Sequence, residues 1–439
     1  MAETTDQQAG TRAGNYFISN YPPYSLWKPE FVRNALEALD RPPRGGNPLG
    51  LYVHIPFCRK RCHFCYFKVY TRRNSREIQE YLDAVISELD IYLQHKFVGG
   101  RKLQFVYLGG GTPSALSTDQ FSGFVTELKE RLPWDASQEI TMECEPGTLS
   151  AKKVEVMRKH DITRLSLGVE NFDDGLLATN GRAHGAGEIH RAWSWIQEQR
   201  FPQVNIDLIA GMLGETEDNW QRCVAKAITM RPESVTIYQM EIPFNTTIFR
   251  QMKEEGKLTA PVADWPTKRR WVGHAFKELE KAGYEVVSSY TAVRRDAGVS
   301  FVYRDALWKG ADLLSIGVSS FGHINGTHLQ NEQNIEQYLA RVEAGELPIY
   351  RAFSPNRKEL MIRELILQFK LGHIRPAYFE GKFGVDIEGE FADQFGELKR
   401  NGHLLAGDEE LVLSRDALLQ VDSLLPAFFL PQHQQARYA

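Results

Sequence analysis

Cysteine is scarce in this sequence, with five residues in a chain of 439. Long apolar runs are also missing, because no stretch approaches the roughly 18–20 residues that span a bilayer, and the first thirty residues have no hydrophobic signal core. The formal net charge of −4 lacks the basic excess of a dedicated nucleic-acid binder. We therefore expect a cytoplasmic protein with no membrane span and no nucleic-acid partner, in which clustered thiols serve metal or redox chemistry rather than disulfides.

The chain is long enough for about two to three domains, and changes of composition along it indicate where they begin and end. The first dozen residues are polar and without periodicity, which predicts a mobile tail. Residues 14–27 hold five aromatic side chains and a Pro-Pro pair, which is typical of an extended arm packed on a surface. Residues 41–48 are rich in Pro and Gly and are the candidate linker. We expect a tail and arm over 1–48, a barrel core over 49–295, a connecting region over 296–350 and a C-terminal domain over 351–439.

Short β-rich runs alternate with longer amphipathic segments in the core region. Six such units in series predict an α/β fold, a partial (β/α)6 barrel of parallel strands with chemistry at the carboxyl ends of the strands. Beyond residue 350 the order helix, helix, hairpin, helix predicts a mainly helical, winged-helix-like domain, for which a lid or packing role is favoured over DNA binding. The strand candidates are residues 51–55, 105–109, 139–145, 164–170, 204–211 and 234–241.

Three of the five cysteines lie within eight positions, directly after the first strand candidate. Cys58, Cys62 and Cys65 have the spacing C-x3-C-x2-C. Three thiolates on a four-iron cluster leave one iron open to a substrate or cosubstrate. The spacing leaves two alternatives open, a zinc site completed by Cys144 or His63 and thiols without a metal. Cys144 and Cys223 fall inside a strand and a helix and are predicted to be small core residues.

Polar residues and glycines collect at the ends of the other predicted strands. Three consecutive glycines in LGGGTP allow a ligand to approach the backbone closely, although this motif is neither a P-loop nor a dinucleotide turn. A carboxylate inside an apolar run such as VNIDLIAG is costly unless it finds a partner. Each such residue could belong to a structural salt bridge, whereas several at one barrel mouth predict a ligand cage. The candidates are Glu143, Glu145, Glu170, Arg182 and Asp207.

The runs YVHIPFCRKRCHFC, GGGTP, RLSLGVE, NGR and NIDLIAG, in this order, resemble the radical S-adenosylmethionine (SAM) superfamily and its HemN-like branch over roughly residues 15–430. The resemblance implies that Cys58, Cys62 and Cys65 hold a [4Fe-4S] cluster whose open iron binds SAM. It also implies that Tyr52, Glu170 and Phe321 serve catalysis, the last in a second SAM region with Ser319 and Ser320. The residues that the resemblance places at SAM are Tyr52, Gly109, Gly110, Gly111, Thr112, Glu143, Glu170, Arg182 and Asp207.

The resemblance implies a radical SAM enzyme that cleaves SAM to a 5′-deoxyadenosyl radical, with reduced flavodoxin or ferredoxin as electron donor. Lys68 follows the third cysteine where the coproporphyrinogen dehydrogenase has another Cys, and Glu170 stands in place of its Gln. These departures favour methyl or methylene transfer with two SAM molecules, as in methylases and cyclopropanases of the branch. We expect the protein to be a monomer and its substrate to be an aromatic, lipid or tetrapyrrole molecule. The alternatives are coproporphyrinogen III dehydrogenase, a haem-degrading methyltransferase and a haem chaperone with His54, His323 and His328 as candidate ligands.

Overall fold

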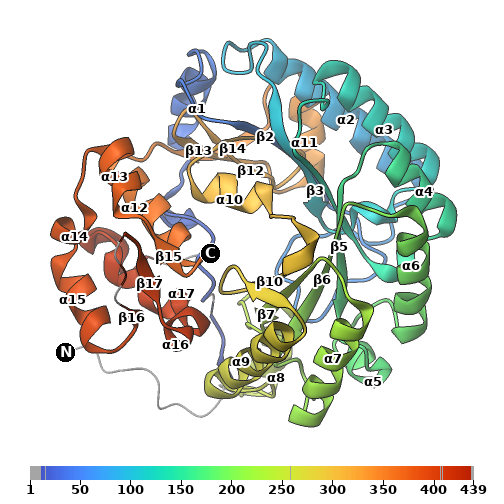
Figure 1. The fold of residues 1–439 in the computed structure, drawn as a ribbon. Helices are drawn as coiled ribbons and strands as arrows, with labels where there is room; N and C mark the ends of the chain where they lie inside the picture. Colours follow the sequence, from blue (N-terminus) through green and yellow to red (C-terminus); the bar gives the residue numbers. More distant parts are fainter. Residues whose placement is uncertain (1–10, 15, 258, 406, 408, 437–439) are drawn as a thin grey trace.

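The computed structural model describes residues 11–436 except 15, 258, 406 and 408. Within this part of the chain, most strands join one curved sheet (Figure 1) in the order β14-β13-β12-β11-β2-β3-β4-β5-β6-β7-β10-β9. The strands from β11 to β7 in that order are parallel; β2 to β7 are the six predicted strands, and β11 is a further parallel strand that was not predicted and lies beyond the expected core. They are β2 Leu49–Ile55, β3 Leu103–Gly110, β4 Glu139–Cys144, β5 Arg164–Glu170, β6 Gln203–Ala210, β7 Ser234–Gln239 and β11 Asp312–Ile316.

Antiparallel strands extend the parallel core on both sides, and the described strands do not close into a full barrel. On one side lie β12 Phe321–Ile324, β13 Thr327–Asn331 and β14 Ile349–Phe353, and on the other β10 Thr291–Arg294 and β9 Tyr284–Val286. The expected α/β fold with a partial barrel is therefore confirmed. These flanking strands were not predicted; they pair antiparallel and lie outside the alternating β/α units on which the prediction rests.

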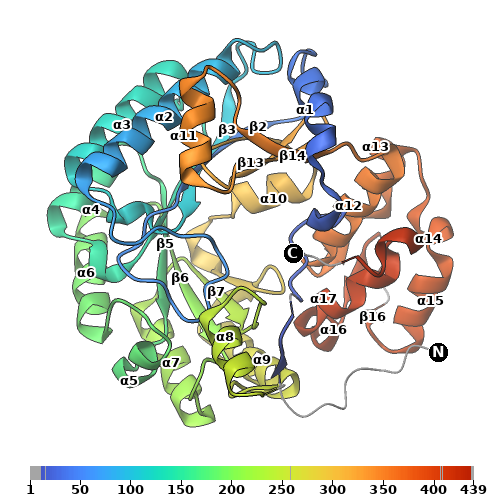
Figure 2. The same cartoon turned by 180° about the vertical axis from the view of Figure 1, so that it is seen from behind.

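Amphipathic helices cover the outer face of the sheet (Figures 1 and 2). The spacing of Ile78, Leu82, Val85, Leu89 and Tyr92 predicts one apolar face; Ile78 is half-buried and the other four side chains are buried. No helix among the described residues is long and apolar enough to cross a membrane. The helices are α2 Ser75–Leu93, α3 Thr118–Arg131, α4 Ala151–Lys159, α5 Asp174–Thr179, α6 Ala186–Gln199, α7 Glu217–Met230, α8 Thr247–Glu254, α9 Trp265–Lys281 and α11 Ile335–Glu343.

A short helix, α10 (Val302–Trp308), lies inside the curve of the sheet. The buried carboxylate of Glu139 accepts hydrogen bonds from the backbone N–H groups of Val302 and Tyr303, at 2.9 and 3.2 Å. This is a helix N-terminus satisfied by an acid from β4. The ring of Tyr303 packs 4.3 Å from that of Tyr107 on β3. Helix α10 therefore fills the barrel from within.

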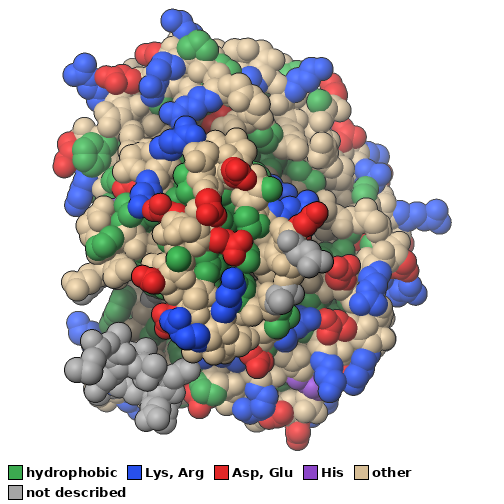
Figure 3. Space-filling model, turned by 60° about the vertical axis from the view of Figure 1, so that its left-hand side comes forward, with side chains coloured by type: hydrophobic (Ala, Val, Ile, Leu, Met, Phe, Trp, Pro, Cys, Tyr) green, Lys and Arg blue, Asp and Glu red, His purple; other side chains and the backbone are tan. Residues whose placement is uncertain are grey.

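The C-terminal region forms its own apolar core beside the two ends of the sheet (Figure 1). Its contacts reach the barrel where Ser289 N–H donates to the carbonyl of Lys370 and Gln239 donates to that of Leu419. Acidic side chains gather near the centre of the face in Figure 3, with basic ones around them. The elements are α12 Arg357–Phe369, β15 His373–Ile374, α13 Pro376–Phe383, α14 Ile387–Glu390, α15 Ala392–Arg400, β16 Leu404–Leu405, β17 Leu411–Leu413, α16 Arg415–Leu419 and α17 Val421–Leu424.

The N-terminal arm is fastened along its length. Strand β1 (Thr11–Arg12) pairs with β8 (Thr259–Ala260), so the expected mobile tail is wrong for these two residues, and residues 1–10 lie outside the described part. Ile18 N–H donates to Asp422, and Lys28 pairs with Ala352 on β14 before α1 (Val32–Leu39) begins. The arm thus runs along the opening of the sheet. The candidate linker over 41–48 is tied down as well, since Asn325 bonds the backbone there.

Candidate functional site

The carboxyl ends of the parallel strands bring the predicted site residues to one end of the barrel. The cysteine segment follows β2, the glycine run ends β3, and Glu143 and Glu170 lie at the ends of β4 and β5. Asp207 lies on β6, in register with Gly168 of β5. The segment between β2 and α2 runs across this end near α8 (Figure 2), where the N–H of Ile248 donates to the carbonyl of His63. Parallel pairing therefore assembles one site from five separate stretches of sequence.

The cysteine segment is held in place by the protein itself. The backbone N–H of Cys58 donates to the carbonyl of Tyr70, and that of Tyr70 to the carbonyl of Pro56. Arg61 donates from Nη2 to the carbonyls of Cys65 and Asn245, at 3.1 Å each. The segment is therefore organised by hydrogen bonds to the chain on both sides of it.

Two neighbouring groups donate hydrogen bonds to the thiols. Thr112 Oγ1 lies 3.3 Å from Cys58 Sγ, and Arg182 Nη1 lies 3.2 Å from Cys62 Sγ. Burial nevertheless raises the pKa of Cys58 to about 12 and that of Cys65 to about 11. Thiols in such surroundings become thiolates when a metal cation compensates their charge.

The donor set fits an iron-sulfur cluster, the group that the cysteine spacing first suggests. Among the described residues, no three His, Cys, Asp or Glu side chains converge closely enough for a single metal ion. A cubane cluster spreads its thiolate ligands more widely than one ion does. The three cysteines remain on one segment, and none of them forms a disulfide. Cys144 and Cys223 are buried in β4 and α7, as expected for core residues.

The glycine run is required by close packing against the strand that precedes the cysteines. Gly111 N–H donates to the carbonyl of Ile55 at 2.8 Å. A Cβ on Gly110, whose φ is +115°, would lie 2.6 Å from the imidazole of His54, and one on Gly111 would lie 2.8 Å from the backbone of Pro56. Side chains at these positions would displace the start of the cysteine segment. The glycines therefore set the position of the thiols as well as leaving backbone accessible.

Three carboxylates line the barrel near the thiols, and burial is the largest cause of the pKa shift of each. It raises the pKa of Glu143 and of Glu170 to about 7 and that of Asp207 to about 6, although hydrogen bonds and cations oppose the shift. Glu143 accepts from Tyr107 OH and from Gly110 N–H, at 2.7 and 3.0 Å. Carboxyl groups whose pKa values are raised above their usual range by burial are suited to binding a cation or a hydrogen-bond donor.

Each of the two later carboxylates has its own support. Asp207 accepts from Ser166 and Asn205, at 2.8 and 2.9 Å. Glu170 has φ of +63°, in the left-handed region that side chains other than glycine rarely adopt, and the pairing of β5 with β6 shifts register between Gly168 and this residue. Such a strained position holds a side chain in a direction that a regular strand would not give.

Arg182 joins the thiol segment to these carboxylates. Its side chain is 11% exposed; Nη2 donates to the carbonyl of Gly168 at 2.8 Å and lies 3.5 Å from Glu170. Burial alone would lower the pKa of Arg182, but negative charge at Cys62 and Glu170 outweighs it and raises that pKa. Its Nε is buried and has no hydrogen-bond partner within the described residues. An unsatisfied buried donor of this kind fits an anionic ligand.

Tyr52 and Phe321, the other predicted catalytic residues, lie in different surroundings. Tyr52 OH lies 3.0 Å from Nδ1 of His54, and its ring stacks 6.0 Å from that of Tyr107. Phe321 on β12 packs 4.6 Å from the ring of Tyr24 in the arm. The structure thus brings Tyr52 to the strands that carry Glu143 and the glycine run, whereas Phe321 lies with the arm.

The loop before Phe321 is fastened by a buried acid, Glu88. Its carboxylate accepts hydrogen bonds from Gly317 N–H, Asn331 Nδ2 and Tyr338 OH, at 2.7, 2.6 and 2.6 Å. Burial raises the pKa of Glu88 to about 7. In the same loop Ser319 has φ of +62°, and the buried Ser320 Oγ has no partner among the described residues.

The histidines considered as haem ligands have protein partners. His323 and His328 face each other with their Nδ1 atoms 3.0 Å apart, and His328 Nε2 lies 3.1 Å from the carbonyl of Tyr21. Burial lowers the pKa of both. The Trp27 ring stacks on His328, with centroids 5.0 Å apart and planes within 2° of parallel. This pair is therefore better described as structural, while His54 contacts Tyr52 and the glycine run.

Sequence reasoning missed an aromatic surface next to the thiols. Tyr66 and Phe67 follow Cys65 directly, are each 45% exposed, and have ring centroids 4.4 Å apart. Partial burial raises the pKa of Tyr66, as do the charges at Glu241, Tyr24, Cys65 and Glu143, while nearly half of its surface remains exposed. The position directly after the third cysteine was the available signal.

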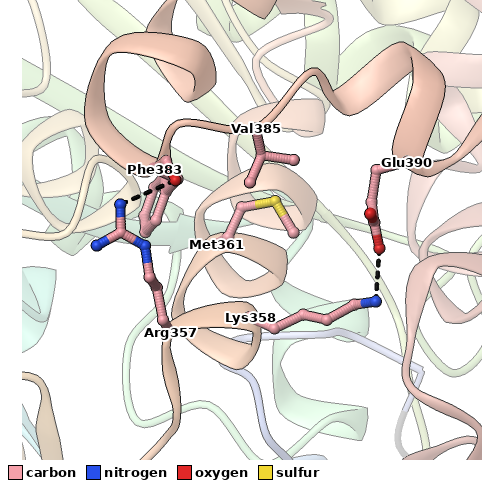
Figure 4. A pocket seen from close by; sticks show the side chains of 6 residues that line it. All are labelled: Arg357, Lys358, Met361, Phe383, Val385 and Glu390. Carbon is pink, nitrogen blue, oxygen red and sulfur yellow. Dashed lines mark hydrogen bonds and ion pairs between the residues drawn. The ribbon is translucent and has the colours of Figure 1, made fainter.

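A separate pocket of about 260 Å³ lies in the C-terminal domain (Figure 4). Its charged groups are already engaged, since Lys358 forms an ion pair with Glu390 at 2.5 Å and Arg357 donates to the carbonyl of Phe383 at 2.8 Å. It contains none of the predicted site residues. Its lining is Arg357, Lys358, Met361, Phe383, Val385 and Glu390.

Comparisons with known proteins agree with this site. Residues 52–227 match the family described as the radical SAM superfamily. The chain is 26% identical over 423 residues to the oxygen-independent coproporphyrinogen III oxidase of Escherichia coli, covering 92% of this chain and 87% of that protein. It is 24% identical over 379 residues to the haem chaperone HemW of Bacillus subtilis, covering 86% of this chain and 98% of that protein.

A solved structure shows the same fold. Coproporphyrinogen III oxidase (HemN) from Escherichia coli superposes with a TM-score of 0.82 and 22% sequence identity, covering 95% of this chain and 99% of that one. The cysteine segment, the glycine run and the carboxylates at the strand ends all lie within the matched family region. The family match over residues 52–227 and the similarity to HemN and HemW along most of the chain support a place in the HemN-like branch of the radical SAM superfamily.

Proposed function

We propose that this protein is a radical SAM enzyme that oxidises a tetrapyrrole, with the oxygen-independent oxidation of coproporphyrinogen III as the best supported reaction. The observation that carries the radical SAM part of the proposal is the position of Arg182, which bridges the thiol of Cys62 and the carboxylate of Glu170 inside the barrel. Methyl or methylene transfer, which the sequence favours, has no counterpart among the relatives described above. Relatives that span nearly the whole chain favour the tetrapyrrole alternative.

The radical SAM fold implies a [4Fe-4S] cluster and SAM. When bound, they supply a one-electron cleavage of the sulfonium C–S bond that yields methionine and a 5′-deoxyadenosyl radical able to take hydrogen from a substrate carbon. Cys58, Cys62 and Cys65 would hold the cluster, because they are the thiols of one organised segment. Thr112 and Arg182 would stabilise two of the thiolates through the hydrogen bonds already present.

The buried polar groups would hold SAM. Arg182 has a free Nε for a carboxylate, and Glu143 and Asp207 offer acceptors for an ammonium group or ribose hydroxyls. Tyr52 and Glu170 would complete this cage on the neighbouring strands. We extend the proposal to a second SAM region at residues 319–321, where the unpartnered Ser320 Oγ supports a ligand.

The substrate would lie against the aromatic surface beside the thiols. Tyr66 and Phe67 expose ring faces on which pyrrole rings can stack, and Tyr238 at the end of β7 is a further ring, 43% exposed. Water is kept from the deeper barrel by α10 and its packing on Tyr107. The chain would thus orient a tetrapyrrole while excluding solvent from the reacting carbon.

A haem chaperone is the second candidate, favoured by the match to nearly the full length of HemW. It predicts haem binding with little SAM cleavage. His323 and His328 offer it little support, because they bond to each other and His328 also bonds to the arm.

Anaerobic assays of the reconstituted protein separate these functions. With a chemical reductant, SAM and coproporphyrinogen III, the proposal predicts formation of 5′-deoxyadenosine together with release of carbon dioxide. Accumulation of S-adenosylhomocysteine instead would favour methyl transfer. Stoichiometric haem binding without 5′-deoxyadenosine would overturn the proposal in favour of the chaperone. Reactions without SAM or without reductant are the controls.

A further inference from the structure

The segment that carries the thiols is strongly basic in an otherwise acidic protein. Residues 58–73, CRKRCHFCYFKVYTRR, contain six Lys and Arg residues and no Asp or Glu, whereas the whole chain has a net charge of −4. No acidic residue occurs anywhere from residue 41 to residue 76. A run of this kind creates a local positive potential on the surface where it is exposed.

Most of these charges face solvent without an acidic partner. Arg59, Lys60, Lys68 and Arg72 are exposed, and none of them takes part in a salt bridge within the described part of the chain. Arg73 differs, since it pairs with Glu77 and Glu336, at 2.7 and 3.0 Å. We name the four exposed residues the basic rim.

The basic rim lies on the same segment as the three thiols that are proposed to hold the cluster. Cys58 precedes Arg59 directly, and Cys65 lies three residues before Lys68. Because the segment is fixed through Tyr70 and Arg61, the charges and the thiols keep a constant relation to each other. A partner bound on the rim would therefore lie against the thiol segment.

We propose that the basic rim is the docking surface for an acidic one-electron carrier protein of the flavodoxin or ferredoxin class. The inference rests on the proposed function, because it names the partner of the same site. One electron leaves the reduced carrier and enters the cluster, and no atom or proton is transferred. Complementary charge steers such encounters and raises association rates by about 10- to 1,000-fold at low salt.

The same charges could instead attract an anionic substrate, and the contacts favour the protein partner. The four rim side chains are exposed to solvent. Guidance into the barrel would need cations turned inward. Among the described residues, Arg182 and Arg164 are buried inside the barrel; Arg182 is paired with Cys62 and Glu170, and Arg164 lies over the ring of Phe301.

The test compares the wild-type protein with the triple variant Lys60→Glu, Lys68→Glu, Arg72→Glu. The control is Lys102→Glu, Arg222→Glu, Lys277→Glu, which reverses the same charge at exposed positions before β3 and on α7 and α9. A bacterial flavodoxin of net negative charge is the probe. Its binding is measured by calorimetry at low and high salt, and 5′-deoxyadenosine formation is followed with either flavodoxin or dithionite as reductant.

We expect the rim variant to bind flavodoxin at least about 10-fold more weakly at low salt, with the difference shrinking at about 0.5 M salt. Its flavodoxin-driven rate should fall in parallel, while its dithionite-driven rate and iron content stay within about twofold of wild type. Unchanged flavodoxin affinity, or an equal loss in the control, would overturn the inference. A raised KM for the tetrapyrrole with dithionite would assign the rim to substrate attraction. No SAM cleavage by wild-type protein with dithionite would count against the proposed function instead.

Discussion

Replacing Arg182 tests the arrangement of the site most specifically. The side chain makes contacts to Cys62 Sγ at 3.2 Å, to the carbonyl of Gly168 at 2.8 Å and to Glu170 at 3.5 Å. Arg182→Ala removes all three and the free Nε that we assign to SAM. Arg182→Lys keeps the positive charge, but lysine lacks the planar guanidinium with which the arginine reaches three acceptors.

The magnitude follows from the loss of charge-assisted hydrogen bonds. Each is worth about 1.5–3 kcal/mol, so loss of one bond to SAM weakens its binding by roughly 10- to 150-fold. Glu170 also loses its cation, which raises its folded-state pKa further above 7. A carboxyl with a raised folded-state pKa loses stability as pH rises from about 4.5 toward that value. The variant should therefore be destabilised more at pH 8 than at pH 6.

The assay is calorimetric SAM binding to reconstituted protein, with iron content and thermal unfolding measured on the same samples. Iron content should stay near wild type, because the three thiols remain. Arg59→Ala is the matched control, since that arginine is exposed and donates to the carbonyl of Gly147. Unchanged SAM affinity in Arg182→Ala would refute the assignment, and parallel loss of iron and SAM without a change in thermal unfolding would assign Arg182 to the cluster thiolate instead of SAM.

Three further predictions follow from burial and packing. Glu88→Gln should flatten the pH dependence of stability. Because burial raises the pKa of the wild-type Glu88 carboxyl to about 7, the free energy of unfolding of the wild-type protein falls by up to about 3 kcal/mol as pH rises from about 4.5 to 7. Urea unfolding at pH 5 and 8 measures this fall, and an equal change of stability with pH in the two proteins would contradict the prediction. Gly110→Ala should cost about 1–3 kcal/mol and reduce iron incorporation. Gly123→Ala, in open space within helix α3, should instead stabilise the protein by about 0.5–1 kcal/mol; a loss of stability equal to that of Gly110→Ala would refute the packing argument. Tyr66→Ala should raise the KM for the tetrapyrrole by about 3- to 10-fold with Tyr350→Ala, an exposed tyrosine on β14, as control; an unchanged KM would remove the aromatic surface from the substrate site.

Periodicity and motif spacing predict the strands of the barrel core well, because buried parallel strands are apolar runs bounded by turns. The expected strand over residues 164–170 is β5 with the same bounds, and the others agree within two residues at each end. Contacts between segments that are distant in sequence leave no such local pattern and could not be predicted. The pairing of Lys28 with Ala352 and the salt bridge of Lys370 with Asp422 join segments that are distant in sequence.

The site shows the same division. Cysteine spacing and carboxylates at strand ends are local signals, and the structure brings Cys62, Glu143 and Asp207 to the same end of the barrel. The left-handed conformation of Glu170 cannot be foreseen from a residue that favours helices, because it arises from the register shift beside β6. The charges around Tyr66 likewise come from distant parts of the chain, such as Glu143 and Glu241, and not from its position in the sequence.

The most direct test of the central claim is metal and sulfide analysis of protein reconstituted without oxygen, comparing wild type with Cys62→Ala and with Cys144→Ala. The account predicts about four iron and four sulfide per wild-type chain and the same for Cys144→Ala, whose thiol is buried away from the segment. Cys62→Ala should lose the cluster and SAM cleavage. Zinc alone in the wild-type protein, or full iron and SAM cleavage in Cys62→Ala, would contradict it.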